Sequence, residues 1–386
     1  MSHGLQGVGV TGPVLVLNAG SSSLKYQVVD PVSGRATVRG VVERIGEGTV
    51  PDHDAALDVM RDDLERHDVT EGDLSAVGHR VVHGGQSLVG PTLVDDDVLA
   101  EIDDLARLAP LHNPPAAAGI RSARHHYPGL PQVAAFDTAF FADLPAAAAT
   151  YALPSEVTAT GVRRYGAHGI SHQYVASEAA AFLDRPAEDL DQIVLHLGNG
   201  ASASAISGGR PVDTSMGLTP LEGLVMGTRA GDLDPGLLLH LLRHGDLDPD
   251  GLEDLLHHRS GLHGMAGMTD LRDILDAVDA GDERAQTAYD VYVHRLRKYV
   301  GAYLAALSGA DVITFTAGVG EHSARVRGSC LRGLDALGVV LDETRNETGD
   351  GARRISTDSS PVAVLVIPTN EELAIARQVV EVLDGA

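Results

Sequence analysis

Residues 14–30, VLVLNAGSSSLKYQVVD, combine a short apolar run, a bend of small and polar residues, and a second run in which apolar and polar residues alternate. This order predicts a β-hairpin, because strands have a period of two and Asn, Gly and Ser favour turns. Residues 193–207, IVLHLGNGASASAIS, repeat the design. Two similar hairpins half a chain apart predict two domains of common architecture.

The segments between and after the hairpins alternate between helical and strand patterns. Residues 52–68 and 95–108 have the spacing of acidic amphipathic helices, and residues 285–307 predict one long helix. Residues 132–140, QVAAFDTAF, predict a buried strand that ends in polar residues. The stretch 142–160, rich in Ala and Pro, is the expected crossing between the domains.

The last third of the chain repeats one order of elements. Residues 311–318, DVITFTAG, predict a strand, which is followed by a glycine turn and a helix beginning near Glu321. Residues 362–383 again give a strand, a polar turn and a helix. We expect this final helix to pack on the first domain.

Composition limits the classes of function. At 386 residues the chain exceeds what one hydrophobic core usually supports, so two domains are expected. The net charge of −25 repels nucleic acid and anionic membranes, so we expect neither as a partner, and a phosphate ligand must meet a local positive cluster. Cys330 is the single cysteine, which fits a reducing compartment. No export signal and no membrane-spanning run is recognisable, so a cytoplasmic location is expected.

Three small-residue bends have the composition of phosphate-binding turns. The bend from Asn18 to Ser23 lets backbone N–H groups approach an anion, and Lys25, one of only two lysines in the chain, follows on the returning strand. The bend from His196 to Gly200 has the same capability. The third, TAGVGEHS at 316–323, places two glycines between a strand and a helix N-terminus. Each bend could equally be an ordinary turn.

Arginines, histidines and acids stand beside further Gly-rich or Pro-rich segments. Arg80 in HRVVHGG and Arg229 in GTRAGDLDP could each clamp a carboxylate or phosphate, or form a surface ion pair. The loop histidines lack the spacing of zinc ligands and are better read as hydrogen-bonding groups: His112, His168 and His172. Asp137 and Glu371 follow strands, where either could hold Mg²⁺ or cap local structure.

In this order, NAGSSSLK, HRVVHGG, LAPLHNP, FDTAF, YGAHGISH, HLGNGAS, MGTRAGDLDP, TAGVGEHS and TNEE resemble the acetate kinase family over essentially the whole chain. The resemblance implies an α/β fold with two ribonuclease-H-like domains, as in the acetate and sugar kinase/Hsp70/actin superfamily. It also implies an interdomain nucleotide cleft and a homodimer. We expect one domain over 1–140 plus 372–386, and a nucleotide-binding domain over 141–371.

The implied activity is the reversible, in-line transfer of the ATP γ-phosphoryl group to acetate, with Mg²⁺ or Mn²⁺. Position by position, the resemblance assigns the metal to Asn18 and Glu371, and an acid/base role to Asp137. His168 and Arg229 become transition-state stabilisers. The substrate positions are Arg80, Val82, Leu111, His112, Ala167 and Pro220. The ATP or ADP positions are Ser21, Ser23, Lys25, His196, Leu197, Gly198, Asn199, Gly200, Asp270, Leu271, Arg272, Gly318, Val319, Gly320, Glu321 and His322.

A carboxylate is ionised at pH 7, so its attack on phosphorus needs no general base, and we expect Asp137 to organise charge instead. The sequence also departs from the family pattern: Ala167 and Ile170 stand in YGAHGISH where YGFHGTSH is usual, Phe141 follows FDTAF where His is usual, and His322 replaces Asn in GENS. Ala167 predicts a roomier acyl pocket and activity on propionate.

Three alternatives follow from the same residues. A propionate kinase shares every motif. A non-catalytic actin-like or Hsp70-like nucleotide switch would leave Arg80, Arg229 and His168 without a task. A sugar or polyol kinase would need a general base for a neutral hydroxyl group, and the small apolar pocket argues against it.

Overall fold

The computed structural model describes residues 12–245 and 247–385. The chain folds into two compact units, each of which is assembled from segments that lie apart in the sequence. Unit 1 comprises residues 1–142, 167–171 and 370–386, and unit 2 comprises residues 143–166 and 172–369. Each unit is built around one mixed sheet of six strands.

The sheet of unit 1 has the strand order β3-β2-β1-β4-β6-β5. The predicted first hairpin is confirmed as β1 and β2, which pair antiparallel, whereas β1, β4 and β6 run parallel. The strands are β1 (Val14–Ala19), β2 (Ser23–Val29), β3 (Ala36–Glu43), β4 (Ala76–Val81), β5 (Thr92–Leu93) and β6 (Gln132–Phe136). The helices are α1 (His53–Arg66), α2 (Asp96–Asp104), α3 (Asn113–His126) and α15 (Glu371–Asp384).

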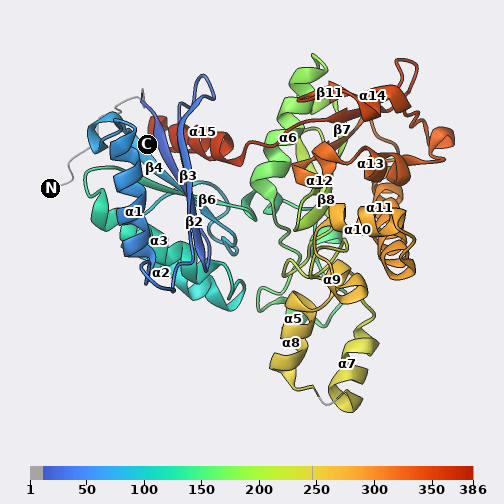
Figure 1. Ribbon diagram of the computed structural model, residues 1–386, viewed down its shortest axis with the longest axis horizontal. Coiled ribbons are helices and arrows are strands. Elements are labelled where there is room, and N and C mark those ends of the chain that lie inside the picture. The colour runs from blue at the N-terminus through green and yellow to red at the C-terminus, as the bar shows by residue number, and fades with distance from the viewer. Residues whose placement is uncertain (1–11, 246, 386) are drawn as a thin grey trace. The chain divides into compact units, whose positions relative to one another are not determined.

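Alternation along β1 explains how both faces of this sheet are covered. Leu15 and Leu17 share a core cluster with residues of α1 and α3. On the opposite face, a Cβ at Gly78 of β4 would lie 2.8 Å from Ile375 and 2.9 Å from Val379, so α15 packs closely on the strand there. The final helix of the chain therefore packs on the sheet of unit 1, as predicted (Figure 1).

The sheet of unit 2 has the order β11-β12-β10-β7-β8-β9. The second predicted hairpin is confirmed as β7 and β8, and β7, β10 and β12 run parallel. The strands are β7 (Asp191–Leu197), β8 (Ala201–Ser207), β9 (Arg210–Thr214), β10 (Val312–Thr316), β11 (Arg353–Arg354) and β12 (Ala363–Val366).

Without the edge strands β5 and β11, the two sheets share one topology. An antiparallel meander of three strands continues through its first strand into two parallel strands, as in a ribonuclease-H-like sheet. The predicted fold class, two α/β domains of this kind, is confirmed.

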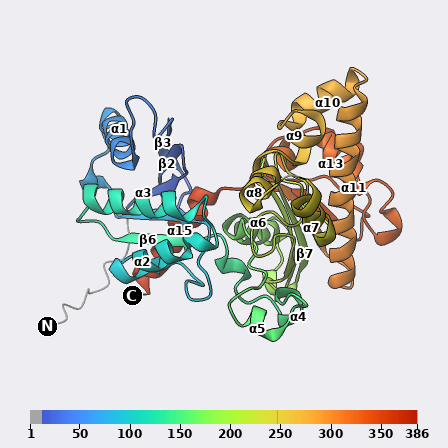
Figure 2. The ribbon, with the colours of Figure 1, turned by 90° about the horizontal axis from the view of Figure 1, so that it is seen from below.

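Several helices of unit 2 lie between β9 and β10 in the sequence. Figure 2 shows α10 beside α11, the long helix that contacts β7 and β8. The helix α6 (Gly169–Phe182) begins in the segment grouped with unit 1 and continues in unit 2. The others are α4 (Ala146–Ala149), α5 (Ser155–Thr158), α7 (Pro235–His244), α8 (Pro249–His258), α9 (Gly261–Ala266), α10 (Leu271–Asp279), α11 (Glu283–Ala306), α12 (Ala317–His322), α13 (Ala324–Leu331) and α14 (Glu343–Glu347).

One predicted helix start was wrong. Instead of a helix beginning near Glu321, the chain forms α12 directly at the end of β10 and then α13, with Ser323 between them. Ala317 takes a left-handed backbone conformation, φ 62°, which turns the chain from strand to helix without a connecting loop.

Candidate active site

In unit 1, the acids and Arg80 predicted for the site meet at the carboxyl ends of β4 and β6. Nη2 of Arg80 donates to Oδ2 of Asp137 at 2.7 Å, and Nε donates to Oδ1 at 3.3 Å. Nε also lies 3.5 Å from Oε2 of Glu371, at the start of α15. Parallel strands bring these residues together, because their carboxyl ends lie at the same edge of the sheet.

Burial sets the ionisation of this cluster. Asp137 is 1% exposed, and burial raises the pKa of its carboxyl group to about 6, although the Arg80 guanidinium acts in the opposite direction. Burial alone would lower the pKa of Arg80, but the carboxylates of Asp137 and Glu371 raise it above its usual range. Arg80 is thus permanently charged and already holds two acids.

The first bend lies beside this cluster. Asn18 on β1 pairs with Lys25 on β2, and both residues line one small cavity together with Arg80 and Glu371. The bend itself is tight: the Gly20 N–H donates to the Ser23 carbonyl at 2.8 Å. His53 of α1 holds the same bend through a contact of 3.1 Å with the Gly20 carbonyl.

His168 and Ala167 lie immediately before α6, in the segment grouped with unit 1. His168 has φ 59°, a left-handed conformation that costs a non-glycine residue of order 1–3 kcal/mol and clusters at functional sites. The next residue, Gly169, donates its N–H to the Asp137 carbonyl at 2.8 Å, and a Cβ there would lie 2.2 Å from that oxygen. This bond ties the backbone immediately after His168 to that of Asp137.

Of the other substrate positions in unit 1, Val82 follows β4, Leu111 is 42% exposed, and His112 is the N-cap residue of α3. Sequence reasoning missed Asn113, which is fully buried. Its Oδ1 accepts from the His83 N–H at 3.1 Å and its Nδ2 donates to the His83 carbonyl at 2.9 Å. This pair fixes the loop that follows Arg80, and the Asn-Pro-Pro start of α3 is its only sequence signal.

In unit 2, a cavity of about 690 Å³ gathers residues from the three stretches of this unit predicted to bind nucleotide, 196–200, 270–272 and 318–322. Its size is that of a small-molecule site. The predicted residues that line it are Gly198, Asn199, Asp270, Leu271, Arg272, Gly318, Val319 and His322. His196, Leu197, Gly200, Gly320 and Glu321 do not line it.

Parallel pairing of β7 and β10 explains why these stretches meet. The bend after β7 and helix α12 after β10 both lie at the carboxyl edge of the sheet. Apolar side chains that the sequence did not single out complete the wall: Leu262, Leu275 and Tyr292. The opposite charges of Asp270 and Arg272 neutralise each other through contacts as short as 2.5 Å, and the hydrogen bonds from Arg272 lower the pKa of Asp270 to about 2.

Glu321, which does not line the cavity, bonds to the backbone of the chain. Its Oε1 accepts from the Thr369 N–H at 3.2 Å. Below α12 lies Arg327, 1% exposed, whose Nη1 donates to the Gly320 and Glu321 carbonyls at 2.9 Å each. Sequence reasoning missed Arg327, which supports the helix that carries Gly318.

Arg229 lies on a loop that contacts the second bend. The Gly227 N–H donates to the Asn199 carbonyl at 3.1 Å, and a Cβ at Gly227 would lie 2.1 Å from Oδ1 of Asn199. Nη1 of Arg229 donates to the Pro220 carbonyl at 2.8 Å, and no carboxylate of the described residues lies within 4.0 Å of its guanidinium. Burial lowers the pKa of Arg229. This desolvated cation is suited to an anionic ligand.

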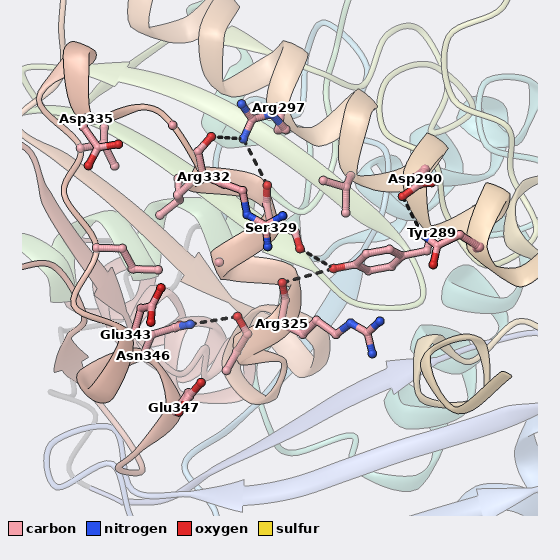
Figure 3. Close-up of a pocket in the computed structure, with 18 residues that line it drawn as sticks. Tyr289, Asp290, Arg297, Arg325, Ser329, Arg332, Asp335, Glu343, Asn346 and Glu347 are labelled. Carbon is pink, nitrogen blue, oxygen red and sulfur yellow. Dashed lines mark hydrogen bonds between the residues drawn. The ribbon is translucent and has the colours of Figure 1, made fainter. Parts of the chain in front are cut away.

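A larger cavity, of about 1020 Å³, lies between α11, α13 and α14, and none of the predicted site residues lines it. Figure 3 shows that one of its arginines, Arg297, is engaged by backbone carbonyls. Arg297 donates to the Ser329 and Arg332 carbonyls at 3.2 and 2.7 Å at the end of α13, and Tyr289 donates to Ser329. We therefore place the candidate active site elsewhere.

The comparisons with known proteins identify the family of the chain. The sequence profile of the acetokinase family matches residues 13–377. The structure of an acetate kinase from Porphyromonas gingivalis is similar, with 39% identity and a TM-score of 0.92 over 96% of this chain and 100% of that one. An acetate kinase from Entamoeba histolytica shows 31% identity and a TM-score of 0.86 over 96% of this chain and 99% of that one.

A propionate kinase from Francisella tularensis subsp. tularensis SCHU S4 is 37% identical, with a TM-score of 0.90 over 95% of this chain and 98% of that one. The chain belongs to the acetokinase family and is an ATP-dependent transferase of the short-chain carboxylate kinase class. Among the described residues, no helix has the length and apolar character needed to cross a membrane.

Proposed function

We propose that the protein transfers the γ-phosphoryl group of ATP to the carboxylate of acetate, giving acetyl phosphate and ADP by direct in-line transfer. The observation that carries the proposal is Arg229: a desolvated guanidinium without an acid partner among the described residues, on a loop bonded to the bend of the nucleotide cavity. An uncompensated cation at such a place stabilises charge on a phosphoryl group in transfer.

Because the carboxylate is already ionised, the protein contributes alignment and charge stabilisation rather than a base. Arg229 and His168 act on the oxygens of the transferred phosphoryl group. Asp137 organises charge: it holds Arg80 in a two-point contact, which aims the remaining guanidinium surface at the substrate carboxylate.

The ATP-binding assignment rests on the cavity of unit 2 and on the bend of unit 1. Gly198, Asn199 and Gly318 offer backbone to the phosphates, while the apolar wall of Leu271, Val319 and Tyr292 suits a purine base. We assign Ser21, Ser23 and Lys25 to the phosphates from the first bend. The positions 196–200 and 318–322 are proposed as a whole, because the residues that do not line the cavity hold those that do.

The residues of unit 1 fit a divalent metal. Asn18 and Glu371 line one small cavity, and the Asn18 side chain makes no hydrogen bond with the described part of the chain. Mg²⁺ prefers oxygen ligands and is usually held by one or two protein groups plus water and substrate phosphates. That requirement matches a site without a larger ligand cluster, and none occurs among the described residues. A bound Mg²⁺ would neutralise charge on the ATP phosphates.

Ala167 suggests an acid longer than acetate as a second substrate. We propose that the acyl group meets Val82, Leu111, Ala167 and Pro220, with His112 as a hydrogen-bonding group. Ala167 is 4% exposed, so a larger side chain there would occupy space taken from the ligand or its neighbours. Discrimination per methylene group is only about 1–3 kcal/mol, so the missing aromatic ring should admit propionate.

The experiment compares acids of increasing length. The protein is incubated with Mg·ATP and acetate, propionate or butyrate, and acyl phosphate is trapped with hydroxylamine. We expect products from acetate and propionate, and we expect Ala167→Phe to shift kcat/KM towards acetate. A steep fall from acetate to propionate that Ala167→Phe leaves unchanged would refute the role of Ala167. A preference for propionate would make the protein a propionate kinase.

Three further assignments accompany the proposal: domains over 1–140 plus 372–386 and over 141–371, a cytoplasmic location, and a homodimer. The homodimer is supported by α7, none of whose described side chains is buried. Its leucines are unusually exposed for an apolar helix: Leu237 by 41%, Leu239 by 51% and Leu242 by 37%. A second copy of the chain would cover them.

A further inference from the structure

The two ends of the loop that carries Arg229 are joined at one acidic residue, Asp232. The Gly223 N–H donates to Oδ1 of Asp232 at 2.8 Å, and the Asp232 N–H donates to the Gly223 carbonyl at 3.0 Å. Gly223 has φ 107°, and a Cβ there would lie 2.6 Å from the Ser215 carbonyl oxygen. The two ends of the loop are thus joined by a reciprocal pair of hydrogen bonds.

Asp232 is held in turn by the long helix α11. The Tyr299 hydroxyl lies 3.1 Å from each carboxylate oxygen of Asp232. Nη1 of Arg295 lies 3.4 Å from Oδ2 of Asp232 and donates to the Gly223 carbonyl at 3.0 Å. Because α11 packs against β7 and β8, the loop closure is fastened to the core of unit 2.

Between these ends the loop has no regular secondary structure. The Met226 N–H donates to the Arg229 carbonyl at 3.0 Å, which closes a turn within the loop. Gly261, at φ 61°, allows a close approach to the same turn: a Cβ there would lie 2.2 Å from the Met226 carbonyl. The backbone beside Arg229 is also bonded to the start of α9, because the Ser260 and His263 N–H groups donate to the Thr228 and Gly227 carbonyls at 3.0 and 2.8 Å. These bonds hold the middle of the loop and Asp232 joins its ends, so the position of the Arg229 guanidinium depends in part on how the loop is closed.

We propose that Asp232, fastened by Tyr299 and Arg295, is a positioning residue that holds Arg229 in the geometry for phosphoryl transfer. The inference rests on the proposed catalytic role of Arg229. Preorganisation explains why an acid is needed here: a displacement of about 1 Å of a catalytic group can cost 10²-fold in rate, and outer partners of catalytic groups are typically worth 10- to 100-fold.

The test is steady-state kinetics with Mg·ATP and acetate on Asp232→Ala, Asp232→Asn, Arg229→Ala and the double variant Asp232→Ala/Arg229→Ala. We expect Asp232→Ala to lower kcat about 10- to 100-fold with the KM for ATP changed less than about twofold. Asp232→Asn keeps an acceptor for the Gly223 N–H and should restore most of the rate. The double variant should be no slower than Arg229→Ala, because Asp232 acts only through Arg229 and both changes remove the same charge stabilisation.

The matched control is Asp234→Ala, which removes the N-cap contact to Gly236 two residues further along and should leave kcat unchanged. If Asp232→Ala does not fold, Tyr299→Phe, with an expected fall of about 3- to 10-fold, takes its place. Near-normal kcat in Asp232→Ala beside a slow Arg229→Ala overturns the inference, as does an additive double variant. Normal turnover by Arg229→Ala would instead overturn the proposed role of Arg229 itself.

Discussion

Arg80 and Arg229 are the same residue type in opposite surroundings. Arg80 makes a two-point contact with Asp137 and lies near Glu371, whereas Arg229 donates only to a backbone carbonyl within the described part of the chain. The charge of a cation that is paired with acids is already partly compensated, so a further anion adds less stabilisation. A desolvated cation without an acid partner is compensated only when an anionic ligand binds. We therefore assign recognition to Arg80 and charge stabilisation to Arg229.

This difference gives the first prediction. Arg229→Ala should lower kcat by about 10²–10³-fold, the usual cost of losing one preorganised donor, while the protein stays folded. Because the removed guanidinium has no carboxylate partner among the residues described, no buried acid is left uncompensated. Kinetics together with a thermal melt would check this. Turnover near that of the wild type would exclude Arg229 from the mechanism.

At this scale the sequence identified the residues with recognisable motifs and missed their supports. Asp137 and Arg80, 57 positions apart, could each be named, but their contact depends on neighbouring parallel strands. Asn113 and Arg327 were missed because a polar residue in a helical pattern reads as exposed, whereas both are buried and bonded to backbone groups.

At the scale of elements, both hairpins were predictable because their period-two patterns flank turn residues. The start of α12 was not, since a left-handed Ala317 breaks the rule that only glycine is expected in such a turn. The helices α7 to α10 were not predicted either. Few of their described residues are buried, so they contribute little to the core of unit 2.

Strand β4 gives a prediction about pH. Burial lowers the pKa of His79 from 6.5 to about 4, and Nε2 of its ring lies 2.7 Å from Oε1 of Gln132. Between pH 6.5 and about 4, His79 is therefore protonated in the unfolded chain but neutral in the folded protein. The stability from the neutral ring is complete above pH 6.5 and is lost as the pH falls towards 4, by about 2 kcal/mol at pH 5.

Urea unfolding at pH 7 and pH 5 would check this with His79→Gln, which keeps a donor but cannot titrate. The wild type should lose more unfolding free energy on acidification than the variant. Asp137, whose raised pKa acts in the opposite direction, is present in both proteins and cancels. Equal losses in the two proteins would contradict the assignment.

At the scale of the whole molecule, the common strand order of the two sheets was expected from the repeated hairpins, because the same local pattern begins each sheet. The net charge of −25 led us to expect that a phosphate ligand would meet only a local group of cations. The cations that we assign to the site are few: Lys25, Arg80 and Arg229. What composition could not indicate is which apolar surface remains uncovered.

The exposed leucines of α7 give the prediction for assembly. Leu239→Glu should weaken the proposed homodimer, since a charge would have to be buried in the interface. Sedimentation velocity over a range of protein concentrations measures the change. Val32→Glu is the control, because Val32 is also exposed, by 90%, but lies in unit 1. A monomeric wild type, or a dimer that Leu239→Glu leaves intact, would refute the role of α7.

We propose that this chain phosphorylates a carboxylate rather than merely binding nucleotide. Phosphorus NMR of the protein with Mg·ATP and acetate measures ADP, acyl phosphate and orthophosphate in one sample. We predict ADP and acyl phosphate in equal amounts, with Arg229→Ala slowing both together. Nucleotide binding with no acyl phosphate, whether ATP persists or is hydrolysed to orthophosphate, would contradict the account.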